Sequence, residues 1–493
     1  MEPFDADSLL RSVTAAGRDG WHLSRRQLLQ TIALAGIAAG CSSTEGASPR
    51  ASGSSSTTRS GPGAGGGADS DADLRLRIER ASFGVTPTLW KEVSSVGFAT
   101  WLDRQIASAP KQAEGSFAEL DGAIDAILPE RPGGGRLAKE DKAELRRASV
   151  GVLTARTVLG AAYAPDQLRQ RMVDVLADRL HVSSSGVPEL YFLPSYDRML
   201  RENAFGRFAD LLVEMASHPA MLLSLDNAAS RADGTNRPNE NFGRELMELH
   251  TVGVDGGYDE TDVVEAAHVF SGWSLDRRTA EFTFKPEWHS LGPLAEGGDI
   301  LGWKPKGRGE ADGKDFLEYL ARHPATAERL VHLLARRFVS EEIAADHPLV
   351  KEAVDIYDEQ DTRLGPVVAH LLTSDRFPAA ATKMLRRPID MVATTLRRAA
   401  AEPKPDDVES IAGGLFGVLR VMGQVPYAWP APDGYPTPSA AWSNAGAVIS
   451  RWNSLITLAH DGVPGLALDP RRIDTSDRDQ MLLTLCSPDL QLV

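Results

Sequence analysis

The sequence predicts a mainly α fold, a large multi-helix domain that carries a short β arm and a Gly-rich insertion. Apolar residues recur at helical spacing in most segments from Leu74 onward, whereas strand-like alternation is confined to one short stretch. An apolar content of 42% and a charged content of 25% are typical of globular proteins. A chain of 493 residues is long enough for one large core or two ordinary ones.

Residues 1–41 are expected to be an export signal. The stretch "SRRQLLQ" places two adjacent arginines before "TIALAGIAAGC", an apolar run too short for a permanent membrane span. This arrangement resembles a twin-arginine signal. The small residues before Cys41 resemble a lipoprotein processing site, although Ala38 stands where a bulky aliphatic residue is usual. We expect lipidation of Cys41 and anchoring to the outer face of the cytoplasmic membrane; the alternative is an amphipathic segment with a chance arginine pair.

Residues 42–73 consist mainly of Ser, Gly, Thr and Ala. Such a segment buries too little apolar surface to offset the entropy lost on ordering, so it is expected to be a disordered tether. Cys486 is the only other cysteine. If Cys41 is lipidated, no intramolecular disulfide forms and the fold depends on its apolar core.

The helical domain is expected to fill residues 74–493. Helical periodicity predicts helices over residues 89–106, 139–162, 165–182, 196–219, 323–339, 347–360, 365–374, 387–400 and 440–459. His323 and His347 each precede a proline at the start of a predicted helix, so we expect them to cap helices and not to bind metal.

The β arm is predicted from "AEFTFKPEWH", in which Phe282 and Phe284 alternate with polar residues. The following residues, 290–313, are Gly-rich and irregular. Loops of this length are usually functional or disordered, and we expect this insertion to lie over the helical body.

The stretch "RPNENFGRELMELHTVGVDGGYDETD", residues 237–262, is the main candidate for a site. A helix capped by Asn239 would gather five polar side chains on one side at about 100° per residue. These are Glu240, Asn241, Arg244, Glu245 and Glu248. We expect Arg244 to bridge Glu240 and Glu248, either as a solvated ladder or as an acidic patch for acid–base or ligand chemistry. His250 is expected near the end of the helix, apart from these carboxylates, with Gly253 in a left-handed conformation.

A second helix is predicted from "YDETDVVEAAHVFSGW", capped by Asp259 or Thr261. It contains Glu265 and His268 at the spacing of half a di-iron site, but a complete site needs two such pairs. We expect both side chains to point away from the buried face, so no metal site is predicted.

Several motifs resemble those of the bacterial domain of unknown function 1800 family. They are "IERASFGVTP", "HPAMLLSLDN", the stretch "PNENFGRELMELHTVGVDGGYDETDVVEAAHVFSGW", "FKPEWH", "HPATAERLVHLLARRFV" and "LCSPDLQL", in order from Ile78 to Leu492. The resemblance implies a secreted, largely helical protein without an established activity. It also implies a partner, because genes of this family commonly lie beside those of an exported family that resembles sulfatases and alkaline phosphatases.

The resemblance also identifies polar positions. They are Asp226, Asn227, Asn239, Glu240, Asn241, Arg244, Glu245, Glu248, Gly253, Gly257, Tyr258, Trp273, His289 and His323. The chain departs from the family at "VLADRLHVSSS", where relatives often carry a segment resembling "FWHNHF". If that segment supplies ligands elsewhere, this chain lacks them or uses His181.

Function remains open between two classes. A net charge of −15 argues against binding of nucleic acid. The first hypothesis is an exported envelope protein that binds a partner or polymer through residues 239–248, the insertion and the polar residues Asp226, Asn227, Tyr258 and Trp273. The second is an extracytoplasmic hydrolase-like enzyme in which Glu245 or Glu248 is the base, Arg244 orients it and His289 completes the site. The sequence shows no haem, flavin, iron–sulfur or nicotinamide signature, so a cofactor remains unknown.

Overall fold

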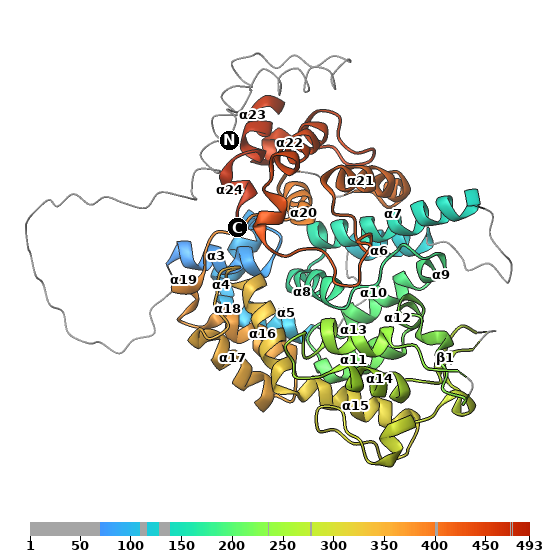
Figure 1. The fold of residues 1–493 in the computed structure, drawn as a ribbon. Helices are drawn as coiled ribbons and strands as arrows, with labels where there is room; N and C mark the ends of the chain where they lie inside the picture. The colour runs from blue at the N-terminus through green and yellow to red at the C-terminus, as the bar shows by residue number, and fades with distance from the viewer. Residues whose placement is uncertain are drawn as a thin grey trace, which may run out of the picture. The chain divides into compact units, whose positions relative to one another are not determined.

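The structure, a computed structural model, describes residues 70–108, 116–127, 139–234, 236–276, 279–399, 403–473, 475 and 477–493. The predicted signal with Cys41, and the predicted tether up to residue 69, lie outside this part of the chain. The described residues confirm the mainly α fold, with one small two-stranded sheet among them (Figure 1). None of the helices in these ranges is both long and apolar enough to cross a membrane.

The first described helix begins at Asp71, within the last residues of the predicted tether, and Ser70 caps it. The helices before the predicted site are α3 (Asp71–Ala81), α4 (Pro87–Val96), α5 (Phe98–Ala107), α6 (Ser116–Ala126), α7 (Lys139–Tyr163), α8 (Gln167–Arg179), α9 (Val187–Leu190), α10 (Leu193–Glu202), α11 (Phe208–Ser217) and α12 (Pro219–Ser224), followed by the 3₁₀ turn η1 (Asn227–Ala229).

The site region and the β arm come next. Their elements are α13 (Asn241–Glu245), the π-helical turn η2 (Leu246–His250), α14 (Glu260–Val269), β1 (Trp273–Leu275), β2 (Phe282–Phe284) and the 3₁₀ turns η3 (Pro286–Trp288) and η4 (Gly292–Glu296).

The remaining helices complete the body. They are α15 (Glu310–Arg322), α16 (Pro324–Phe338), α17 (Pro348–Glu359), α18 (Leu364–Thr373), α19 (Phe377–Ala380), α20 (Pro388–Ala399), α21 (Val408–Met422), α22 (Ala445–His460), α23 (Arg478–Leu485) and α24 (Pro488–Gln491), with 3₁₀ turns η5 (Pro405–Asp407), η6 (Ser439–Trp442) and η7 (Pro470–Ile473).

One hydrophobic cluster joins the helices, from Ile78 in α3 to Leu490 in α24. Helix α7 packs against α20 and α21, α11 against α15, and α16 against α17. Because the apolar faces of helices far apart in the sequence share this core, the side chains that face its polar gaps also come from distant segments.

Two predicted helices are each divided in the structure. The 89–106 segment is two helices, α4 and α5, separated at Gly97. The 196–219 segment is interrupted between α10 and α11, where the Phe208 N–H donates to the Thr362 carbonyl at 2.9 Å and the Phe205 carbonyl accepts from Gly365 at 3.3 Å. These tertiary bonds satisfy backbone groups that a continuous helix would have used.

The two predicted histidine caps are confirmed. The Nδ1 atom of His323 accepts the Ala325 N–H at 3.3 Å, and that of His347 accepts the Leu349 N–H at 3.2 Å. In each case the histidine satisfies a free donor at the helix start, where the proline has no N–H to offer.

The predicted β arm is confirmed as an antiparallel pair in which Phe282 lies opposite Leu275 and Phe284 opposite Trp273. The Gly-rich insertion that follows is fastened by apolar side chains, since Leu294 and Ile300 are buried. The Trp303 ring lies 4.8 Å from that of Phe316 in α15.

Candidate cationic site between α8 and α16

The predicted polar stripe on α13 is only partly assembled. Asn239 accepts the Asn241 N–H at 2.8 Å, as expected of a residue at a helix start. Arg244 contacts Glu240 at 3.3 Å, but its second partner is Glu260 at 2.8 Å. The prediction that Arg244 would bridge to Glu248 is therefore wrong.

The reason lies in a change of helix type after Glu245. Residues 246–250 form the π-helical turn η2, which widens the helix and rotates Glu248 away from the position it would take on an α-helix. The turn ends at Gly253, whose φ of +88° confirms the predicted left-handed conformation. The Gly253 N–H donates to the Met247 carbonyl at 2.8 Å.

Arginines from two other helices bind the carbonyl groups at the end of this turn. Arg329 of α16 donates through Nη1 to the Glu248 carbonyl, and Arg179 of α8 donates through Nη2 to the Thr251 carbonyl at 3.2 Å. His250, fully buried, has its Nδ1 atom 3.1 Å from the Arg179 carbonyl. The π turn thus holds two arginine side chains at fixed positions, because helix ends leave carbonyls unpaired.

These arginines line a cavity of about 610 Å³, counted with its open mouth, which we call the α8–α16 cavity. Its walls are Val175, Asp178 and Arg179 of α8, Arg329, Leu333 and Arg337 of α16, Leu249 of η2, Arg387 before α20, and Asp433, Tyr435 and Thr437 of the segment after α21. The helical contributions recur every three or four residues, so each helix presents one face to the cavity. In Figure 1 the orange-red chain that follows α21 passes over α8, where the Tyr435 N–H donates to Asp178 at 3.3 Å.

The cavity wall continues into a buried network of three arginines and three aspartates, of which Asp178, Arg337 and Arg387 line the cavity. Arg171 contacts Asp390 at 2.8 Å, Arg337 contacts Asp390 at 3.2 Å, and Arg387 contacts Asp174 at 2.5 Å. Arg337 also pairs with Asp174, and Arg387 with Asp178. The network is neutral in sum, as buried charges must be if they are to remain ionised.

Asp390 is the shared acceptor of this network. Burial alone would raise the pKa of its carboxyl, but Arg171, Arg337 and Arg387 together hold that pKa below its ordinary value. Each arginine of the network is therefore paired with at least one aspartate, although the Nε atoms of Arg337 and Arg387 have no hydrogen-bond partner and burial raises the pKa of Asp178.

Arg179 and Arg329 differ from that network, because neither forms an ion pair within the described ranges. Burial and the neighbouring Arg329 together lower the pKa of Arg179 to about 9. The Nε atom of Arg179 is buried without a hydrogen-bond partner. Two neighbouring guanidinium groups without a salt-bridge partner, with only the charge of Glu248 acting on Arg329, are costly to the free protein, which is typical of a site that receives an anion.

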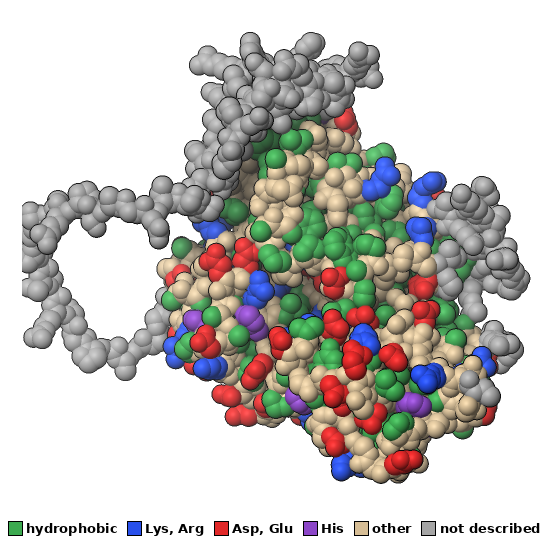
Figure 2. Space-filling model, in the orientation of Figure 1, with side chains coloured by type: hydrophobic (Ala, Val, Ile, Leu, Met, Phe, Trp, Pro, Cys, Tyr) green, Lys and Arg blue, Asp and Glu red, His purple; other side chains and the backbone are tan. Residues whose placement is uncertain are grey.

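The side of the cavity that Asp433 lines, which we call its mouth, is acidic. Asp433 lines it and accepts the Trp429 indole N–H at 2.8 Å. Burial raises the pKa of Glu245, and the nearby carboxylates of Glu248 and Asp433 raise it further. Figure 2 shows Asp and Glu side chains gathered over α13 and α14, with a few basic residues among them.

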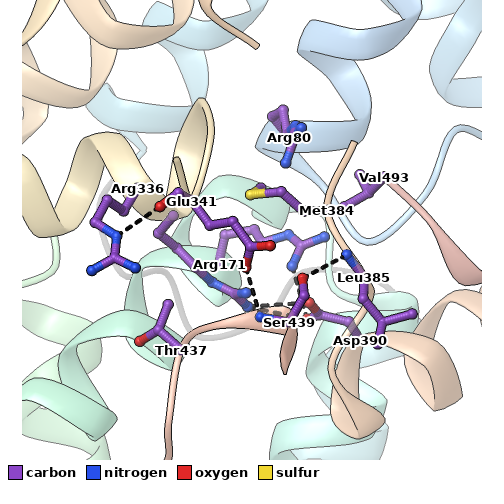
Figure 3. A pocket seen from close by; sticks show the side chains of 11 residues that line it. Arg80, Arg171, Arg336, Glu341, Met384, Leu385, Asp390, Thr437, Ser439 and Val493 are labelled. Carbon is purple, nitrogen blue, oxygen red and sulfur yellow. Dashed lines mark hydrogen bonds and ion pairs between the residues drawn. The ribbon is translucent and has the colours of Figure 1, made fainter. Parts of the chain in front are cut away.

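A second cavity adjoins the first, since Arg337 and Thr437 line both (Figure 3). Arg80 points into it with Nε and Nη1 buried and without hydrogen-bond partners. Burial and the surrounding arginines lower the pKa of Arg80 to about 9. The cavity is closed on one side by Ser439, whose N–H donates to Glu341 at 2.6 Å. The unpartnered Nε and Nη1 atoms of Arg80 extend the cationic character of the region.

The predicted catalytic partner His289 lies elsewhere. Its Nδ1 atom is 3.0 Å from the Ser271 carbonyl, and its ring lies 5.3 Å from that of Phe284. Burial lowers the pKa of His289. The titratable groups that act on it are Asp312 and His268, and Glu245 and Glu248 are not among them. The structure does not bring His289 together with Glu245, Glu248 and Arg244 into one acid–base site.

Several other predicted residues have structural contacts. Asn227 is fully buried and donates to the Phe270 and Trp273 carbonyls, both at 3.2 Å. Asp226 is exposed with a left-handed φ of +58°. Tyr258 packs against the core, and burial raises its pKa. Trp273 is completely buried.

Helix α14 corrects a further prediction. Asp259 caps it as predicted, and Val263, Ala266 and Phe270 form its buried face. Glu265, however, is 6% exposed, because Gly298 of the insertion lies over its carboxylate. Within the described residues, no group of three or more His, Cys, Asp or Glu side chains is placed to hold a metal ion.

Two other described histidines, His218 and His181, have ring nitrogens engaged by neighbouring groups. Ser195 lies 3.2 Å from Nε2 of His218, but Nδ1 of His218 accepts the Ala220 N–H. The ring proton is therefore on Nε2, which donates to Ser195 and cannot accept its proton. His181 has both ring nitrogens on carbonyls, at 3.3 Å from Ala177 and 2.9 Å from Trp429.

Sequence reasoning missed Arg179, Arg329 and the segment around Asp433. A signal existed in α16, where Arg329 and Arg337 flank Leu333 on one helical face. A second existed in "VLADRLH", where the chain departs from the family pattern at Asp178 and Arg179, two residues that line the cavity.

Comparison with known proteins yields one match. The sequence pattern of the family described as "Protein of unknown function (DUF1800)" matches residues 77–490. No curated protein and no solved structure matches the chain.

Proposed function

The chain belongs to the DUF1800 family of proteins of unknown function, and from that premise and the geometry of the α8–α16 cavity we propose that it is a binding module for an oxyanion group. The observation that carries the proposal is the pair Arg179 and Arg329, which face the cavity without an ion-pair partner among the described residues. Guanidinium groups bind carboxylate and phosphate oxygens through paired N–H donors.

Binding is better supported than acid–base catalysis. Arg244, the residue expected to orient a base, is engaged by Glu240 and Glu260. His289 interacts with Ser271 and Phe284, away from the glutamates. The cavity offers fixed positive donors but no paired nucleophile and base.

The proposal extends to the setting of the protein. The twin-arginine-like segment and Cys41 support export and lipid anchoring, which would hold the binding module at the outer face of the cytoplasmic membrane. The oxyanion would then be presented by an envelope polymer or by another exported protein, such as the sulfatase- or phosphatase-like partner suggested by the family resemblance.

Calorimetric titration of the full chain with inorganic phosphate at low ionic strength tests the proposal. We expect saturable binding that weakens at least tenfold in Arg179→Gln and in Arg329→Gln. Arg329→Lys should also bind more weakly, because it keeps the charge but loses the paired donors. The control is Arg322→Gln, which removes a guanidinium paired with Glu318 and Asp361. Absence of phosphate binding, or equal losses in Arg322→Gln, contradicts the proposal.

A further inference from the structure

The α8–α16 cavity contains unpaired charges of both signs. Arg179, Arg329 and Asp433 line it. Glu245 lies outside this lining, but near enough to Asp433 for that carboxylate to raise the pKa of Glu245. None of these four side chains forms an ion pair within the described ranges. A ligand that matches this arrangement must itself carry both signs.

We infer that the ligand is a phosphate monoester that carries a primary ammonium group, with the phosphate at Arg179 and Arg329 and the ammonium at Glu245 and Asp433. The inference rests on the proposed oxyanion binding and specifies its substrate class.

The phosphate assignment follows from charge. A phosphate monoester carries about −1.5 to −2 charges at neutral pH and offers three acceptor oxygens. Arg179 and Arg329 supply two positive charges, and each has already directed one N–H to a carbonyl of the π turn, which fixes the direction of the remaining donors. A single carboxylate would leave one guanidinium uncompensated.

The ammonium assignment follows from the negative charge at the mouth of the cavity. An anion without a positive group would have to pass and remain near Asp433 and Glu245, and like charges in a partly buried site repel. The Glu248 carboxylate lies near both the acidic and the basic groups, since it interacts electrostatically with Glu245 and with Arg329. Arg244 offsets this negative charge only in part: its charge lowers the pKa of Glu245, but Glu240 and Glu260 already accept its donors.

Free amines and simple dianions are therefore both disfavoured. An amine is repelled by the two arginines, and a dianion is repelled by the carboxylates at the mouth. The uncharged part of the cavity, which includes Leu249, Leu333 and Val175, suits the short alkyl chain between the two charged groups.

The test is a set of calorimetric titrations of the full chain with four probes. They are O-phosphoethanolamine, n-propyl phosphate of the same length without the ammonium, ethanolamine, and glycerophosphoethanolamine, a diester with one fewer negative charge. We expect O-phosphoethanolamine to bind about tenfold more tightly than n-propyl phosphate. The diester should bind more weakly than the monoester, and ethanolamine should not bind.

Variants assign each charge to its position. Glu245→Gln and Asp433→Asn should abolish the preference for O-phosphoethanolamine and leave n-propyl phosphate binding equal or stronger. Arg179→Gln should weaken both phosphates. Glu296→Gln, an exposed carboxylate of the insertion, is the control and should change neither affinity.

The outcomes separate this inference from the proposed function. Equal affinity of the wild-type chain for O-phosphoethanolamine and n-propyl phosphate overturns the inference and leaves oxyanion binding intact. If neither phosphate binds, both fail. An unchanged preference in Glu245→Gln and Asp433→Asn also overturns the assignment of the ammonium position.

Discussion

Replacement of Gly253 by alanine should damage both stability and anion binding, whereas the same replacement at Gly257 should damage stability alone. Both glycines have a φ of +88°, so an alanine at either position meets the same backbone strain. Their surroundings differ. A Cβ atom on Gly253 would lie 2.9 Å from Cδ and 3.0 Å from Nη1 of Arg329, whereas at Gly257 the nearest atom, Cδ2 of Leu301, is 3.9 Å away.

The magnitudes follow from these distances. A left-handed alanine costs about 1 kcal/mol relative to glycine, which is the full effect expected for Gly257→Ala. In Gly253→Ala, Arg329 must move and loses its bond to the Glu248 carbonyl. A hydrogen bond from a charged donor contributes about 2 kcal/mol, so we expect a total loss of about 3 kcal/mol in the free energy of unfolding.

Two measurements on the full chain check the prediction. Urea denaturation should place Gly253→Ala about 2 kcal/mol below Gly257→Ala, the difference between the two estimates. Phosphate titration should show a loss of about tenfold for Gly253→Ala, because the displaced guanidinium no longer faces the cavity, and no change for Gly257→Ala. If the two variants lose equal stability and bind phosphate equally, Gly253 has no part in positioning Arg329 and the role assigned to the π turn is wrong.

Three further predictions concern buried and exposed charges. Burial lowers the pKa of His250 to about 3, below its ordinary value of 6.5, so below pH 6.5 the unfolded chain binds a proton that the folded chain does not. The free energy of unfolding should therefore be constant above pH 6.5 and fall by about 2 kcal/mol between pH 7 and pH 5. Denaturation of His250→Gln at both pH values should show a smaller fall. Asp390→Asn should cost about 4 kcal/mol in urea denaturation, because it leaves Arg171 buried without its counter-ion, and a loss below 1 kcal/mol would show that the network is not ionised. Arg244→Gln should cost less than about 1 kcal/mol, since its bridge to Glu260 is largely exposed, and a larger loss would assign it a structural role beyond that bridge.

The fold was predictable because helical periodicity is a local property. The helices that contain α8 and α16, the caps His323 and His347, and the strand around Phe282 and Phe284 follow from residues near in sequence. The division between α10 and α11 was not predictable, because it depends on backbone bonds to Thr362 and Gly365, which are distant in the chain.

Most of the site was not predictable from the sequence. The stretch 237–262 was singled out for its polar content, but of its residues only Leu249 lines the α8–α16 cavity, and its geometry was derived for an ideal α-helix. The π turn at Leu246–His250 removed Glu248 from the expected stripe, and no residue pattern in that turn distinguishes it from an α-helix. The counter-charges of the buried network also lie beyond sequence reasoning, since Arg337 and Asp174 are 163 residues apart.

The motifs that carry the family resemblance meet around one structure. Glu79 of "IERASFGVTP" contacts Arg386 at 2.6 Å, and the closing "LCSPDLQL" holds the same segment through the bond from the Arg386 N–H to the Gln491 carbonyl at 2.9 Å. The central stretch contributes the π turn that fixes Arg329, which lies within "HPATAERLVHLLARRFV". Packing of the core alone would require only apolar residues in these segments. Buried charges are costly to fold, so the positions that these motifs give them, Glu79 against Arg386 and Arg329 against the π turn, require more than core packing to account for them.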